Sequence, residues 1–189
     1  MLRINFREEY DVSDDLQDLL DYVEQKYDSA VTSINSSKLP SVFSKVNFEP
    51  GTVNLDYGGG RYDNVAEYLK QYDVLNLVYD PFNRAKEHNK EVLDIVKKNG
   101  GADTITCSNV LNVIEEPEIR ANVIKNCKRC LKSGGTAYFT VYEGDGTGAG
   151  KANDKKSSYQ VNKKTAEYVE DIKDVFNSVT RKGKVIIAK

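Results

Sequence analysis

The residues whose types and spacing point most directly to chemistry are an aspartate and three glycines near position 58. Asp56 follows an apolar stretch that begins at Val53, and after it come Tyr57, Gly58, Gly59 and Gly60. A strand that ends in a glycine turn and continues into a helix brings backbone N–H groups and the positive end of the helix dipole together. Glycine also lets the backbone approach a ligand without a Cβ atom in the way. The segment therefore predicts a binding site for a negatively charged group.

A second acid stands at the end of the next predicted strand. Residues 74–79 are mostly apolar, and Asp80 follows them 20 residues beyond Gly60. Ligands of open α/β sheets bind outside the carboxyl ends of the strands, where an acid at this distance suits a ribose. A carboxylate accepts two hydrogen bonds, which matches the two hydroxyls of the sugar. Pro81 ends the strand, so an ordinary turn role for Asp80 is the alternative.

The spacing of the glycines separates two classes of cofactor. A dinucleotide-binding loop has a third glycine where this chain has Asp63, which weighs against a nicotinamide oxidoreductase. The pattern Asp-x-Gly-x-Gly at a strand end instead resembles the loop of class I methyltransferases that use S-adenosylmethionine (SAM). In that family the acid and the glycine backbone hold the methionine part of the cofactor. Tyr62 departs from the family, many of whose members have a small residue there.

The resemblance continues along the chain and covers residues 52 to 189. Residues 103–114 resemble the central strand of the family and the turn after it, and residues 132–141 resemble its glycine turn and fifth strand. The resemblance implies that the end of the central strand faces the adenine or the sulfonium. The cofactor-binding residues that it implies are Asp56, Tyr57, Gly58, Gly59, Gly60, Asp80, Pro81, Ser108, Asn109 and Val110.

Strand and helix patterns alternate from Val53 onward, which predicts an α/β fold with a mostly parallel sheet and right-handed crossovers. The apolar periodicity predicts helices over 62–72, 83–98, 117–131 and 164–176. The family has a C-terminal antiparallel hairpin, which residues 178–188 would form. Only one helix fits between residues 81 and 102, where the family normally has a further strand and helix. We therefore expect a Rossmann-like sheet of about six strands with one edge strand missing.

The first 50 residues precede this core. Ser13 is a suitable N-cap for a helix that runs to about residue 28. This helix is expected to form a cap that could close over the site, and packing on the sheet is the favoured role of its apolar stripe. Residues 29–51 predict a linker with a short helix around Phe43. With 189 residues in all, the chain is expected to fold as one domain, with a cap and linker over 1–50 and the SAM-binding core over 51–189.

Composition narrows the setting. The sequence has 39% hydrophobic and 30% charged residues, and neither a signal peptide nor a run of membrane-spanning length is found. Three cysteines without a secretion signal predict a reducing compartment, so the cytoplasm is the expected location.

Other motifs give weaker signals. Cys127 and Cys130 form a C-x-x-C pair, but they lie near a helix C-terminus and lack further ligands, so buried packing is expected and no metal site is predicted. His88 is expected at the surface. The glycine-rich segment 143–151 fails the P-loop pattern, which leaves a flexible lid or a structural loop as its interpretations.

Together these features predict a SAM-dependent methyltransferase that releases S-adenosylhomocysteine (SAH). The methyl acceptor is not predicted and is open among small molecules, nucleic acid and protein; the oligomeric state is open too. Tyr142 and Glu143, just past the fifth strand, are the side chains nominated for acid–base work or substrate contact. The alternative hypothesis is a module on the same fold that binds the nucleoside or a protein partner without methyl transfer.

Overall fold

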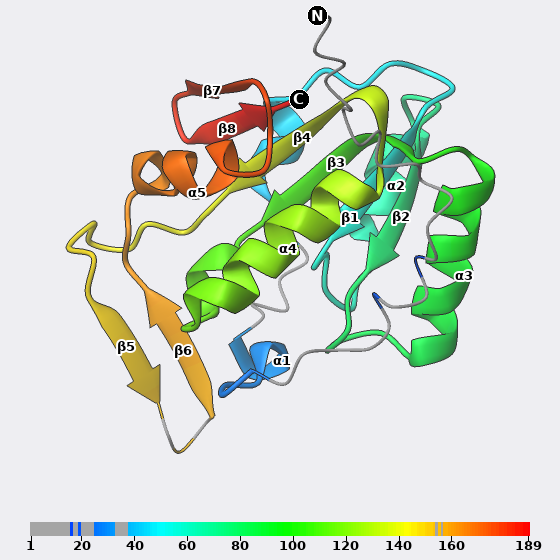
Figure 1. Cartoon of the computed structure of the whole chain (residues 1–189). Helices are drawn as coiled ribbons and strands as arrows, with labels where there is room; N and C mark the ends of the chain where they lie inside the picture. The colour runs from blue at the N-terminus through cyan, green and yellow to red at the C-terminus, as the bar shows by residue number, and fades with distance from the viewer. Residues whose placement is uncertain (1–15, 17–18, 20–24, 33–37, 154, 156) are drawn as a thin grey trace, which may run out of the picture.

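Six strands form one mostly parallel sheet in the computed structural model, which describes residues 16, 19, 25–32, 38–153, 155 and 157–189 (Figure 1). The strand order is β2-β1-β3-β4-β8-β7, with β1 to β4 parallel and the last two antiparallel. The predicted fold class and the C-terminal hairpin are confirmed. The strands span Val53–Tyr57 (β1), Leu75–Tyr79 (β2), Ala102–Ser108 (β3), Leu131–Thr140 (β4), Val179–Lys182 (β7) and Val185–Ala188 (β8).

Helices cover both faces of the sheet (Figure 1). The helix α2 (Asn64–Lys70) and the 3-10 turn η2 (Ser41–Ser44) bury apolar side chains in a cluster on one face. The helices α3 (Lys86–Lys98), α4 (Pro117–Arg129) and α5 (Val169–Lys173) contribute to the larger core on the other face. All four predicted core helices are present, but the last one divides into the 3-10 turn η5 (Thr165–Tyr168) and α5.

Among the described residues the sheet has six strands and ends at β2, as predicted for a sheet with one edge strand missing. The first two turns of α3 cover part of this open edge. Val78 carbonyl oxygen lies 2.9 Å from His88 Nε2, and Asn89 forms two 3.0 Å hydrogen bonds with the backbone N–H and carbonyl of Asp80. His88 is half-buried and contacts the backbone, so it has a structural place rather than the surface position that was expected. Side chains thus supply hydrogen bonds at an edge that a neighbouring strand would otherwise cover.

The predicted N-terminal helix falls mostly outside the described residues. Leu16 and Leu19 are buried in the core of the α4 face, which places these two side chains against the sheet. Residues 25–28 are not helical, so the predicted end of the helix near residue 28 is wrong. A short helix α1 (Ser29–Thr32) follows instead. The short helix around Phe43 is confirmed as η2.

A second sheet of two strands, β5 (Gly150–Asn153) and β6 (Ser158–Val161), was not predicted. The glycine-rich segment before it folds around the buried side chain of Asn162, which donates to Asp145 Oδ1 at 3.0 Å. Gly144 has a φ of +55°, and a Cβ atom there would overlap Asn162. These contacts give the segment a defined structure, which favours the structural-loop interpretation.

The covered edge of β2 leads to a stability prediction. We expect Asn89→Ala to lower the free energy of unfolding by about 1–3 kcal/mol, because it leaves the buried Asp80 N–H without a partner, whereas the Asp80 carbonyl keeps the N–H of Arg84. Chemical denaturation monitored by circular dichroism measures this change. His88→Ala removes one contact to a single carbonyl and serves as the smaller comparison. Equal stability of Asn89→Ala and the parent protein would contradict the role of this edge.

Candidate functional site

A pocket of about 370 Å³ opens at the carboxyl ends of β1, β2 and β3. This volume lies in the range of small-molecule sites in proteins. The structure brings all ten predicted cofactor-binding residues to its lining, and Tyr142 with them. The ten come from the ends of β1, β2 and β3 and run from position 56 to position 110 of the sequence. Their roles toward a cofactor stay predictions.

The glycine turn is closely packed at its first two positions. Gly58 has a φ of +75°, and its N–H donates to the Tyr79 carbonyl at 2.7 Å. A Cβ atom on Gly58 would overlap the Val110 side chain. A Cβ atom on Gly59 would lie 2.5 Å from Asp56 Oδ2. Glycine is therefore required at both positions, because the turn runs between the acid of β1 and the residue after β3.

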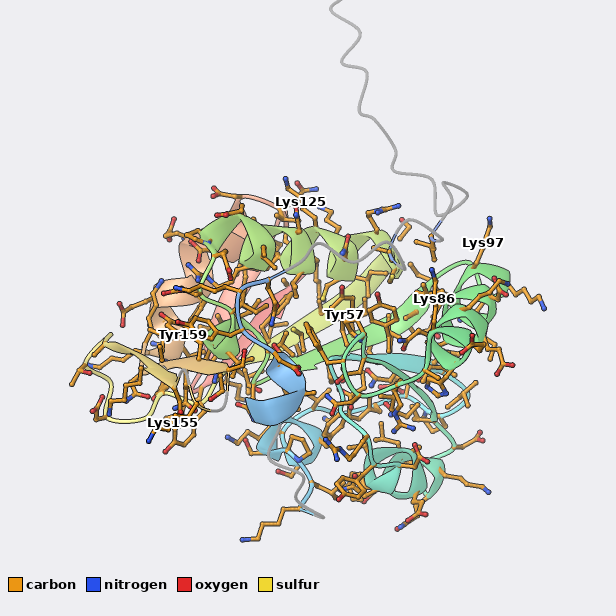
Figure 2. The ribbon with its side chains drawn as sticks, turned by 90° about the horizontal axis from the view of Figure 1, so that it is seen from below. Tyr57, Lys86, Lys97, Lys125, Lys155 and Tyr159 are labelled. Atoms are coloured by element: carbon orange, nitrogen blue, oxygen red, sulfur yellow. The ribbon has the colours of Figure 1, made fainter. Side chains whose placement is uncertain are left out.

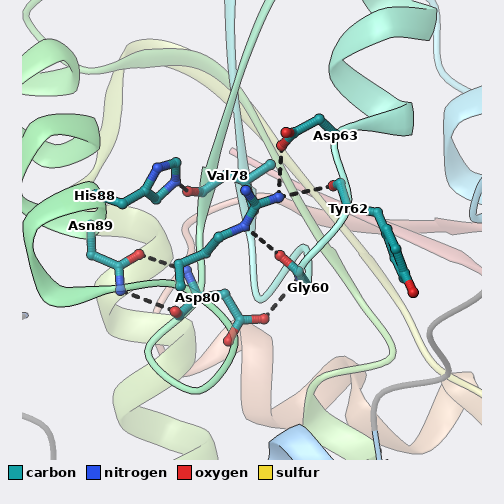
Figure 3. Close-up of polar contacts among 8 residues, drawn as sticks. Gly60, Tyr62, Asp63, Val78, Asp80, His88 and Asn89 are labelled. Carbon is teal, nitrogen blue, oxygen red and sulfur yellow. Dashed lines mark hydrogen bonds and ion pairs between the residues drawn. The ribbon is translucent and has the colours of Figure 1, made fainter.

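Arg84 holds the far side of the same turn, a role that the sequence analysis missed. Its Nε donates to the Gly60 carbonyl at 2.8 Å, and its Nη2 donates to the Tyr62 carbonyl at 3.0 Å (Figure 3). The same nitrogen pairs with Asp63 at 2.8 Å. The guanidinium fork suits this role since it presents several donors in a fixed plane. Arg84 stands in a loop 24 residues after Gly60, and no sequence motif marks it.

Asp80 connects the glycine turn to the turn after β2. It is 4% exposed, and its Oδ2 accepts from the Gly60 N–H at 2.9 Å (Figure 3). Its Oδ1 accepts from the N–H groups of Phe82 and Asn83, both at 2.9 Å. The Asn83 side chain donates to Oδ2 at 3.1 Å. Asp80 is therefore compatible with both interpretations, because it orders the turn after β2 and also lines the pocket.

Asp56 is a buried carboxylate at the end of β1. It is 2% exposed, and burial together with the nearby charge of Asp80 raises its pKa to about 7. Thr106 Oγ1 donates to Asp56 Oδ1 at 2.9 Å. This hydrogen bond and the positive charge of Arg84 both lower the pKa of Asp56 and so offset part of the increase. Thr106 in turn accepts from Asn54 Nδ2 at 3.1 Å. These polar side chains within apolar strands hold the carboxylate in a fixed position.

The end of the central strand carries an unusual backbone conformation. Asn109 has a φ of +60°, and its N–H donates to the Thr140 carbonyl at 2.9 Å. Asparagine is among the few non-glycine residues that adopt this left-handed conformation readily. Beside it, the hydroxyls of Ser108 and Thr140 lie 2.9 Å apart. The chain therefore turns sharply at the pocket, where the sequence predicted a turn after the central strand.

The two nominated catalytic residues are in different surroundings. Tyr142 is 56% exposed and lines the pocket. Glu143 is not among the lining residues; its carboxylate pairs with Lys184 at 2.6 Å and accepts from the Thr165 N–H at 2.9 Å. These contacts lower the pKa of Glu143 to about 2. The carboxylate is thus a poor proton acceptor near neutral pH and ties the segment after β4 to η5 and to the turn between β7 and β8 instead.

The wall opposite the strand ends was not predicted from the sequence. It comes from the 3-10 turn η3 (Leu111–Val113), α4, β6 and the segment before α1. Tyr27 and Tyr159 stack with ring centroids 5.7 Å apart and hold that segment against β6. Figure 2 looks at this end of the sheet, with Tyr57 near the centre and Tyr159 on the side of the β5–β6 hairpin. The added polar lining residues are Gln25, Ser29, Asn83, Asn112, Asn122, Asn126, Arg129 and Gln160.

The three cysteines lie away from the lining and are buried, as expected. Burial raises the pKa of Cys127 well above its usual value, so its thiol is unreactive. Within the described part of the chain, no three His, Cys, Asp or Glu side chains are grouped as metal ligands. No helix among the described residues is long and apolar enough to cross a bilayer.

Comparison with known proteins agrees with this geometry. The methyltransferase domain family matches residues 24–176, most of the sequence. The chain belongs to the methyltransferase domain family. No curated protein matches the sequence.

Solved structures of methyltransferases share the fold. A chain of the complex between the Haloferax volcanii Trm112 methyltransferase activator and a methyltransferase is 13% identical, with a TM-score of 0.53 and coverage of 85% of this chain and 80% of that one. The Burkholderia thailandensis 1,6-didemethyltoxoflavin-N1-methyltransferase, solved with that compound and SAH, is 15% identical, with a TM-score of 0.53 and coverage of 85% and 78%. These similarities concern the fold.

The raised pKa of Asp56 gives a prediction with a definite sign. In the unfolded chain the pKa of an aspartate is near 3.8, and in the folded protein that of Asp56 is about 7. Between these two values the folded state holds a proton that the unfolded state has lost, so stability falls as pH rises through this window and is constant above it. We expect Asp56→Asn to remove this dependence and to raise stability at pH 8 by on the order of 4 kcal/mol.

Thermal unfolding of the parent protein and the variant at pH 5 and pH 8 measures this effect. The difference in melting temperature should be larger at pH 8 than at pH 5. Asp174→Asn, at an exposed position, is the matched control and should change neither value. A variant that is less stable than the parent at pH 8 would show that burial does not dominate at Asp56.

Proposed function

We propose that this pocket binds SAM across the ends of β1 and β2 and that the protein transfers the methyl group to an acceptor on the opposite side. The observation that carries the proposal is the position of Asp56 and Asp80 at adjacent strand ends, on the two sides of one glycine turn and in one pocket. The SAH complexes among the similar folds agree with this ligand.

The amino acid part of SAM would lie at the glycine turn beside Asp56. An ammonium group next to this buried carboxylate would lower its pKa below about 7 and be bound most tightly by the ionised form. The affinity for SAM should therefore rise with pH through the pKa of the free protein. The buried carboxylate destabilises the protein while the pocket is empty, so a cationic ligand that compensates its charge would bind well there.

The ribose would lie beside Asp80. Backbone N–H groups occupy much of the carboxylate, but the 3.1 Å contact from the Asn83 side chain involves a group that can rotate away. A ribose hydroxyl can replace this donor at Oδ2 without a change in the backbone. The adenine would then lie toward Asn109 and Val110 at the end of β3, as the family resemblance implies.

The sulfonium of SAM makes the methyl group electrophilic, so the protein's own contribution is alignment and exclusion of water. Tyr142 is exposed at the pocket and would contact the acceptor. We do not assign a catalytic part to Glu143, because its low pKa and its ion pair occupy it elsewhere. The non-catalytic alternative would show SAM binding without methyl transfer.

The setting of the protein is part of the proposal. The buried thiols of Cys107, Cys127 and Cys130 suit a reducing compartment, which supports the cytoplasm. We also infer one domain over residues 1–189, because side chains of the N-terminal segment enter the same core as β1 and α4.

Isothermal titration with SAH tests the site. We expect Asp80→Ala to lower the affinity at least tenfold, because it removes the ribose acceptor and loosens the turn. The 2′-deoxyribose analogue of SAH separates the two causes: the parent protein should prefer SAH, and Asp80→Asn should discriminate less between the two ligands. Asn83→Ala removes the competing donor, together with the contact from Arg61 to the Asn83 side chain, and should bind SAH at least as tightly as the parent. An Asp80→Asn variant that keeps the full preference for SAH would contradict the ribose assignment.

A further inference from the structure

The side of the pocket that faces away from Asp56 and Asp80 is lined by carboxamide side chains from four separate segments. Gln25 precedes α1, Asn112 lies in η3, Asn122 lies on α4 and Gln160 lies on β6. If the adenosyl group occupies the strand ends as proposed above, these side chains face the methyl acceptor. We propose that this wall recognises a neutral nitrogen heterocycle that bears an amide or lactam group, and that the methyl group is transferred to its nitrogen.

Asn112 is the main observation. Its side chain is 1% exposed, lines the pocket, and has a buried Oδ1 without a hydrogen-bond partner. A buried polar atom without a partner is costly, and the great majority of such atoms are paired in native proteins. A ligand in the pocket can supply the missing partner. The carboxamide offers both a donor and an acceptor, so it matches a ligand edge that carries the complementary pair.

The segments around Asn112 are fixed to one another, so the wall has a defined shape. Arg120 Nη1 donates to the carbonyls of Ile114 and Glu115, at 2.9 and 2.8 Å, and orders the connection from η3 to α4. The Lys26 N–H donates to Glu116 Oε1 at 2.9 Å, and the Asp28 N–H donates to the Ser157 carbonyl at 2.8 Å. These bonds tie the segment before α1 to the η3–α4 connection and to the β5–β6 hairpin. A fixed set of polar groups can select a ligand by its pattern of donors and acceptors.

Charge decides against an ionic acceptor. The only acids in the described lining are Asp56 and Asp80, which the adenosyl amino acid would occupy, and its only base is Arg129. Seven residues separate Arg129 from Asn122 along α4, or about 10 Å of helix, and Arg129 already has interactions within the protein. A charged acceptor would lose its hydration without an opposite charge beside it. Carboxamide side chains can form the hydrogen bonds that a neutral ring needs when the ring carries an amide group of its own.

The lining residues also indicate which kind of acceptor atom attacks the methyl group. The described lining residues include no histidine, lysine, glutamate or cysteine to remove a proton from an attacking hydroxyl; the other candidate bases are Asp56 and Asp80, which would hold the cofactor, and the phenol of Tyr142. A ring nitrogen attacks with its own lone pair. The new N–C bond forms as the C–S bond breaks, and the electron pair of that bond goes to sulfur, which becomes the neutral thioether of SAH. At a pyridine-type nitrogen the positive charge moves to that nitrogen. A lactam nitrogen, whose lone pair is delocalised into its carbonyl, has to lose its proton to water as the N–C bond forms, and its product is neutral.

The test uses matched pairs of probe compounds that share a ring and differ in charge. Transfer of the tritiated methyl group of SAM is measured to nicotinamide against nicotinate, and to uracil against orotate, with tyramine as a cationic phenol. We expect a neutral member to be methylated on nitrogen and its charged counterpart to be at least tenfold poorer in kcat/KM. Preferred methylation of nicotinate, orotate or tyramine would overturn the proposal, and so would absence of transfer to every probe.

Substitutions in the wall test whether its carboxamide side chains recognise the acceptor. We expect Asn112→Ala to lower kcat/KM for the neutral probe by about 10- to 100-fold with unchanged SAH affinity. Because Asn112 is buried, the exposed Asn122→Ala gives a second measurement that does not depend on folding, with Asn177→Ala as an exposed control outside the pocket. Full activity of both Asn112→Ala and Asn122→Ala would overturn the proposal. The inference rests on SAM binding, and SAH titration separates the two: loss of SAH binding in the parent protein refutes the proposed function, whereas SAH binding without the expected selectivity refutes only this inference.

Discussion

The hydrogen bond from the Gly60 N–H to the Asp80 carboxylate is the contact on which the site depends, because it joins the turn after β1 to the turn after β2. The same carboxylate accepts the N–H groups of Phe82 and Asn83, so one side chain fixes two backbone turns at once. Arg84 completes the arrangement from the other side by donating to the Gly60 carbonyl. Both backbone polar groups of Gly60 are thus held by side chains from the neighbouring strand end. The shape of the pocket at this end follows from these bonds.

The loss of an edge strand makes this anchoring necessary. In a larger sheet β2 would have a neighbour on each side, whereas among the described strands it pairs with β1 alone. The N–H and carbonyl of Asp80 are bound instead by the Asn89 side chain, and the Val78 carbonyl lies beside His88. Helix α3 thus provides, through side chains, part of the hydrogen bonding that the absent strand would have provided. Asp80 keeps its position at the end of an edge strand for this reason.

The sequence predicted those features that local residues determine. Glycines at positive φ, acids at strand ends and apolar strands are encoded within a few positions, and the structure brings the predicted cofactor residues to one pocket. Arg84 and Asn112 were missed because their roles depend on which distant backbone they meet. The β5–β6 hairpin was missed because its strands are only four residues long and β5 has no large apolar side chain. Glu143 looked suitable by its position after β4, but its partners Lys184 and Thr165 are distant in sequence and fix it elsewhere.

Each side of the pocket holds a polar group whose burial destabilises the protein until a ligand binds. At the strand ends, the protein buries a carboxylate whose pKa is raised to about 7, so the empty pocket is destabilised by a charge that a cationic ligand would compensate. On the opposite side, the unpaired Asn112 Oδ1 is a smaller cost of the same kind, which a neutral hydrogen-bonding ligand would remove. Each of these groups marks a place where a ligand would stabilise the protein. One group is charged and the other is neutral, and this difference would distinguish the proposed cofactor end of the pocket from the proposed acceptor end. A protein with this division should gain stability from each ligand separately, because the two groups lie on different walls and share no hydrogen bond in the described structure.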